Sequence, residues 1–212
     1  MRSQLNELLE QLNELEAQLE RELRVARPQW GYRFERNRVR FDADTRRRHR
    51  RLRRSIPRFF REARLSHLLT APLIYSLVVP FALLDVWVTL YQWLCFPIYG
   101  VARVPRQRYI VVDRHRLDYL NAIEKAHCVY CGYANGVLAY VREVAARTEH
   151  YWCPIKHARG VAQPHRWYPR FADFGDAADY HDGLEGRRRE LAGANPPPLR
   201  AIEDDDGGRS AA

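Results

Sequence analysis

The residues best suited to do chemistry are three cysteines and one histidine in the second half of the chain. Cys128 and Cys131 have the Cys-x2-Cys spacing, and Cys153 and His157 follow after a further twenty-one residues. Three thiolates and one imidazole are a ligand set that tetrahedral zinc favours in structural sites. The pattern therefore predicts a closed zinc site, and an iron-sulfur cluster that also uses Cys95 is a less favoured alternative.

The chain between these two pairs must double back if all four residues are to share one ion. A helix over Ala134–Arg147 would serve as the returning arm, and a helical turn from Pro154 would place Cys153 and His157 on one face. The same turn would put the Cys153 sulfur at a positive helix end, which favours the thiolate. Burial of the thiols as small hydrophobes and redox chemistry of the first pair remain open.

Catalysis has weaker support. Asp113, His115 and Asp118 lie close together in the sequence, with Glu124 further on, and a His-Asp pair can act as a general base. These are ordinary positions for solvated side chains, and no third residue that would orient the base is identifiable. We therefore assign no catalytic residue and favour a binding role over an enzyme.

The longest apolar stretch runs from Leu65 to Ala102 and contains Asp85 as its single acid. Its thirty-eight residues exceed the ~20 of one membrane crossing and fall short of two. Pro72, Pro80 and Pro97 interrupt the stretch, which allows either one kinked span or a hairpin that turns near Pro80. Arginines lie on both flanks, which favours two cytoplasmic ends and hence a hairpin or re-entrant anchor.

Asp85 is the exceptional residue of this stretch. An acid at membrane depth is costly and is by default a functional candidate, as the partner of an ion or a proton. In a hairpin, Asp85 would instead lie close to the membrane–water interface, where a carboxylate can remain hydrated.

Ten arginines fall between Arg46 and Arg64, immediately before the apolar stretch. They predict a basic amphipathic helix on an anionic leaflet, where each arginine contributes about 1 kcal/mol. Nucleic acid is a less favoured partner, because few aromatic residues that could stack on bases lie within the block. The arginines expected to contact lipid phosphates are Arg46, Arg47, Arg50, Arg53, Arg54, Arg58, Arg61 and Arg64.

The remaining segments complete a mainly α-helical, membrane-anchored architecture. Leucines at alternating spacings of three and four over residues 5–23 predict a coiled-coil-like helix, which either forms a homo-oligomer or packs on the protein itself. Short strands are expected near Tyr32 and at Tyr109–Val112. The predicted segments are an amphipathic helix at 1–26, a basic juxtamembrane region at 27–64, the membrane segment at 65–102, the Cys/His module at 103–160, a partly helical extension at 161–193 and a disordered tail at 194–212.

Three stretches carry a resemblance to other proteins, namely Tyr109–Asn121, Cys128–Gly136 (CVYCGYANG) and Tyr151–His157 (YWCPIKH). Together with the apolar segment before them, they resemble a family of bacterial membrane-associated proteins without a known activity. The resemblance covers residues 65 to 160 and leaves both ends of the chain outside it. It implies membrane association in a bacterium and assigns no catalytic residue.

The combined expectation is a protein anchored in the bacterial inner membrane, with its zinc module in the cytoplasm as a docking surface or scaffold. Four cysteines are too few for a secreted disulfide framework, and the first residues lack a signal-peptide pattern, so reduced thiols are expected. A membrane-bound redox carrier or enzyme that uses the same thiols is one alternative, and a nucleic-acid-binding module is another.

Overall fold

The computed structural model describes residues 32–35 and 38–193, together with part of the segment 11–25. The chain divides into two compact units, one from Arg54 to Pro197 and the other containing the residues before and after it. The predicted leucine seam over residues 5–23 and the predicted tail at 194–212 lie largely or wholly outside the described residues. The described seam leucines, Leu15 and Leu19, are helical and exposed, and self-association through them stays a prediction.

The first unit contains a small hairpin and a basic helix. Strand β1 (Tyr32–Glu35) pairs antiparallel with β2 (Arg38–Phe41), which confirms the strand expected near Tyr32. Helix α2 (Ala43–Leu52) follows, and α3 (Ile56–Glu62) belongs to the second unit. The arginine block therefore forms two helices rather than one, because Pro57 fits a helix start but not a helix interior.

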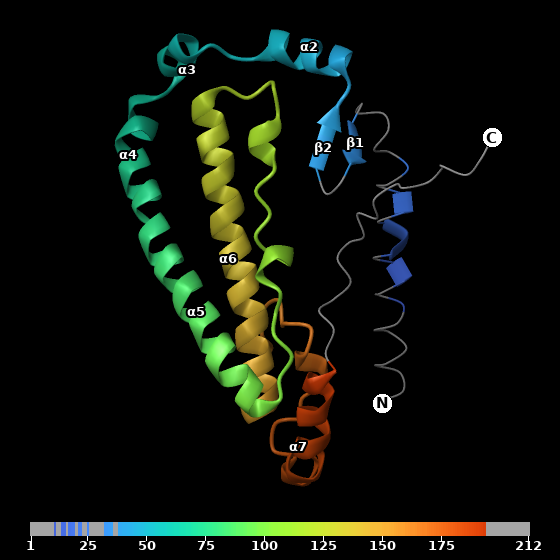
Figure 1. Ribbon diagram of the computed structural model, residues 1–212. Coiled ribbons are helices and arrows are strands. Elements are labelled where there is room, and N and C mark those ends of the chain that lie inside the picture. Colours follow the sequence, from blue (N-terminus) through green and yellow to red (C-terminus); the bar gives the residue numbers. More distant parts are fainter. Residues whose placement is uncertain are drawn as a thin grey trace, which may run out of the picture. The chain divides into compact units, whose positions relative to one another are not determined.

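In the second unit, α4 (Leu65–Ser76) and α5 (Val78–Tyr99) form one kinked helix of 35 residues (Figure 1). The hairpin prediction is thus wrong, and the alternative of a kinked helix is confirmed. Pro80 has no N–H to donate to the Ser76 carbonyl, which bends a helix without reversing it, and Leu77 keeps helical backbone angles. Within the described residues this is the one helix long and apolar enough to cross a membrane.

Helix α6 (Ala122–Trp152) runs parallel to α5, and residues 100–121, here called the return segment, lead the chain back alongside α6 (Figure 1). The parallel direction follows from the contacts, since Ile74 accepts a hydrogen bond from Tyr130 near one end and Tyr99 stacks on Tyr151 at the other. Gly100, with φ of 67°, ends α5 in the left-handed conformation that glycine tolerates best.

The return segment lies so close to α6 that two positions of α6, Gly132 and Gly136, require glycine. A Cβ atom on Gly136 would lie 2.8 Å from both the Ile110 Cα and the Tyr109 carbonyl oxygen, and one on Gly132 would lie 3.2 Å from the Val111 oxygen. The strand predicted at Tyr109–Val112 is therefore wrong, because this stretch packs against a helix and pairs with no described strand.

The core of this unit lies where α5, α6 and α7 (Ala177–Ala192) meet. Phe96, Val104, Tyr140 and Leu191 are almost fully buried in it. Helix α7 confirms the partly helical segment expected before residue 193.

Candidate functional site

The structure does not bring the four predicted zinc ligands together. Cys128 and Cys131 lie inside α6, and Cys153 caps its C-terminal end, 22 positions after Cys131. At 1.5 Å per helical residue, these positions are about 33 Å apart. The predicted shared site is therefore corrected: a helix that runs unbroken from Ala122 holds the two pairs apart.

The helix predicted to begin at Ala134 begins at Ala122 instead, because its first turn is capped there. The Asn121 side chain accepts hydrogen bonds from the N–H groups of Ile123 and Glu124, and Glu124 accepts one from the Asn121 N–H. This capping box fixes the helix start. Glu124, which follows Asp113, His115 and Asp118 in the sequence, is thus a capping residue.

The surroundings of Cys153 also differ from the expectation. The thiol lies at the negative end of α6, whereas a helix N-terminus would have favoured ionisation. Burial, followed by the nearby Glu149 carboxylate, raises the pKa of Cys153. His157 contacts Tyr168 through its backbone N–H and its ring. Among the described residues no three His, Cys, Asp or Glu side chains are grouped to hold a metal, and zinc binding stays a prediction without a site.

His127, which precedes Cys128 in the chain, is a packing residue. Its ring stacks on Tyr75 of α4 at 5.6 Å and lies 6.3 Å from the Phe59 ring of α3. These contacts join the first turns of α6 to both preceding helices.

Asp85 is a buried structural acid with a cationic partner. It is 5% exposed, and Arg106 of the return segment donates two hydrogen bonds to its carboxylate, of 2.8 and 2.6 Å. The Tyr133 hydroxyl donates a third, of 3.0 Å. A carboxylate held by a bidentate arginine and a tyrosine is fully satisfied, so Asp85 needs no ion or external proton.

A second polar residue on α5, Gln92, is satisfied in the same way. Its amide donates to the Val104 carbonyl and the Tyr140 hydroxyl and accepts from the Val104 N–H. Thr89 hydrogen-bonds to the Tyr140 hydroxyl as well. The polar residues of α5 therefore form one ladder that faces α6 and the return segment.

The opposite face of the kinked helix is apolar and uncovered. Leu69 and Trp87 are each 72% exposed, Leu83 is 67% exposed and Ile98 is 78% exposed. A helical period of 3.6 residues aligns these positions along one side. We call this surface the apolar stripe; its members with more than half of their surface exposed are Leu65, Leu69, Leu73, Val79, Leu83, Val86, Trp87, Trp93 and Ile98.

All eight arginines predicted to contact lipid phosphates are exposed. They divide between the two units: Arg46, Arg47, Arg50 and Arg53 accompany α2, and Arg54, Arg58, Arg61 and Arg64 accompany α3. The α3 group adjoins the start of the apolar stripe in the chain, and its acid, Glu62, pairs with Arg58 at 2.6 Å.

Sequence reasoning missed a buried charge cluster on α6. Glu143 accepts hydrogen bonds from Arg147, which is fully buried, and from Arg166 and the Trp167 indole. These cations hold the pKa of Glu143 below its usual value despite burial. The one sequence signal was the four-residue spacing of Glu143 and Arg147, which usually marks a solvated helix face.

Comparison with known proteins adds no assignment. No family model matches the chain, and no curated protein or solved structure matches it either.

Proposed function

We propose that this protein is a membrane-surface anchor and interaction module that lies on an anionic leaflet through its apolar stripe and the arginines around α3. The observation that carries the proposal is the division of α4–α5 into two faces. The hydrogen bonds of the Asp85, Thr89, Tyr91 and Gln92 side chains are made toward α6 or the return segment, whereas the stripe residues are exposed. Soluble monomers rarely expose a continuous apolar surface of this length, and such surfaces mark membrane or protein contacts.

A helix lying in the plane of the membrane fits these contacts better than a spanning one. Helix α6 and the return segment accompany α5 from one end to the other, so a spanning α5 would draw them into the bilayer. Arg103, Arg106 and the exposed Arg142 would then lie at membrane depth, at about 2.5–3.5 kcal/mol each. In the in-plane arrangement the stripe enters the interface and these arginines stay in water.

The in-plane arrangement also agrees with three other features. Arginines on both sides of residues 65–102 leave both flanks on one side of the membrane, as the sequence predicts. Trp87 and Trp93, both more than half exposed, are side chains that favour headgroup depth. Phe60 on α3 is 49% exposed and lies among arginines, which suits an anionic leaflet such as the bacterial cytoplasmic membrane.

Vesicle flotation tests the anchor. The wild-type chain should float with vesicles that contain phosphatidylglycerol, and high salt should weaken this through the arginines. Leu83→Glu should lower the membrane partition roughly tenfold to hundredfold, since it removes a buried leucine and adds a repelled charge. Ala139→Glu, at an exposed position of α6 outside the stripe, is the matched control. Equal flotation of the two variants contradicts the proposal.

Thiol labelling tests the topology. With the four native cysteines replaced by serine, Ser55→Cys places one reporter before the kinked helix, and Gly160→Cys places one beyond the far end of the parallel α6; both positions are exposed. In sealed vesicles an impermeant maleimide should reach both reporters from the same side. Reaction of only one until the vesicles are opened would show a span.

A further inference from the structure

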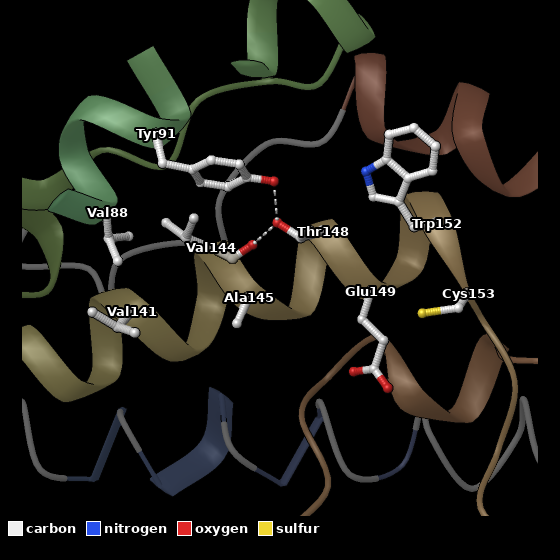
Figure 2. A pocket seen from close by; sticks show the side chains of 9 residues that line it. All are labelled: Val88, Tyr91, Val141, Val144, Ala145, Thr148, Glu149, Trp152 and Cys153. Carbon is white, nitrogen blue, oxygen red and sulfur yellow. Dashed lines mark hydrogen bonds between the residues drawn. The ribbon is translucent and has the colours of Figure 1, made fainter. Parts of the chain in front are cut away.

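A groove opens between α5 and α6 beside the apolar stripe (Figure 2). Its volume is about 510 Å³, within the range of protein sites for small ligands. The lining residues are Val88, Tyr91, Val141, Val144, Ala145, Thr148, Glu149, Trp152 and Cys153.

The two hydroxyl groups on its wall, those of Tyr91 and Thr148, are hydrogen-bonded within the protein. The Thr148 hydroxyl donates to the Val144 carbonyl at 2.9 Å, so the Tyr91 hydroxyl donates to Thr148 at 3.1 Å (Figure 2). Glu149 points away from this pair and accepts a hydrogen bond from His165 at 2.9 Å. An occupant therefore meets valine, alanine and tryptophan surface, and the site suits a hydrocarbon rather than a polar molecule.

The α5 wall of the groove continues into the stripe. Val88 lies one helical turn after Leu84, and Tyr91 lies one turn after Trp87. Leu84 is 36% exposed and Trp87 is 72% exposed, so the surface passes from groove to stripe without a polar boundary. A chain that leaves the bilayer along the stripe would reach the groove without crossing water.

We infer that this groove binds one acyl chain of a membrane phospholipid. The inference rests on the proposed membrane contact, which supplies the ligand. It explains why a groove lined mainly by apolar surface, with its two hydroxyls hydrogen-bonded, lies at the border of the stripe, and it gives the anchor a lipid contact of defined stoichiometry.

The test uses the full chain extracted from membranes in mild detergent, washed, and analysed for bound phospholipid by mass spectrometry. The wild type should retain about one phospholipid per chain. Ala145→Phe fills the groove and should lower retention roughly tenfold, because it displaces several methylenes of the acyl chain. Ala139→Phe, at an exposed α6 position that does not line the groove, should retain as much as the wild type.

Each outcome has a clear meaning. Normal flotation with no retained phospholipid in the wild type, or with equal retention in both phenylalanine variants, overturns the groove while the membrane anchor stands. Loss of flotation in the wild type removes the anchor itself. A stable dimer whose groove holds a second copy and no phospholipid also overturns the inference.

Cys153 gives a second measurement that needs no groove-filling variant. In a chain with Cys95, Cys128 and Cys131 replaced by serine, phospholipid vesicles should slow maleimide labelling of Cys153 several-fold. Ala139→Cys, in a chain without native cysteines, reports any general shielding by the membrane. Equal slowing at both positions, or no slowing at Cys153, contradicts the inference.

Discussion

Substitution of Gly136 by alanine places a methyl group where the return segment crosses α6. The added Cβ atom would lie 2.8 Å from the Ile110 Cα and from the Tyr109 carbonyl oxygen. Both are backbone atoms, so neither can swing aside as a long side chain would. Either the return segment or the helix must shift.

The size of the effect follows from two opposing contributions. Alanine favours the helix by about 1 kcal/mol over glycine, and overpacking against a fixed neighbour costs about 1–3 kcal/mol. Contact with two backbone atoms places the cost at the upper end, so the free energy of unfolding should fall by about 2 kcal/mol. In Gly186→Ala on α7, the added Cβ atom has no neighbour within 4 Å, so this substitution should raise the free energy of unfolding by up to about 1 kcal/mol.

Urea unfolding in mild detergent, followed by tryptophan fluorescence and circular dichroism, measures both variants under the same conditions. With a slope of about 1–3 kcal/mol per molar urea, the two midpoints should differ by about 1 M or more. Coincident midpoints would refute the close crossing of the return segment over α6.

Three further predictions concern the charged and titratable groups. Asp85→Asn leaves Arg106 without its carboxylate and should lower the free energy of unfolding by about 1–3 kcal/mol, with a double-mutant cycle against Arg106→Met to measure the coupling. Burial lowers the pKa of His150, so the unfolded chain binds the proton more readily. Stability should therefore be complete above about pH 6.5 and fall as the pH drops below it, and His150→Gln should remove that part of the slope in urea titrations at several pH values. Glu149→Gln should lower the pKa of Cys153 and speed its reaction with maleimide at neutral pH, and an unchanged rate-pH profile would contradict the role given to that carboxylate.

Local patterns in the sequence predict much of the secondary structure. The apolar run from Leu65 identifies the kinked helix, and aromatic alternation near Tyr32 identifies the first strand. These features depend on residues close in sequence, for which periodicity and proline position are sufficient signals. The residues near Pro80 alone could not distinguish a kink from a hairpin, because the outcome depends on whether a distant part of the chain packs along α5.

The zinc site shows why the remainder could not be predicted. The helix predicted over Ala134–Arg147 is longer than expected, because Gly132 lies within it and allows close packing against Val111, which lies 21 positions earlier. Once the helix is continuous, Cys131 and Cys153 cannot meet. Asp85 is a similar case, because its partner, Arg106, lies 21 residues away and carries no sequence signal of that pairing.

The parallel pairing of α5 and α6 has a consequence for synthesis of the chain. The side-chain hydrogen bonds between these helices join residues 48 to 57 positions apart. At about 5–20 residues per second, a ribosome needs roughly 3 to 10 s after completing one partner to add the other. Throughout that interval Asp85 and Gln92 lack their partners on α6 while the apolar stripe is already made. Under the proposed membrane anchor, a nascent chain whose stripe reaches the bilayer during this interval would be shielded there from aggregation before folding is complete.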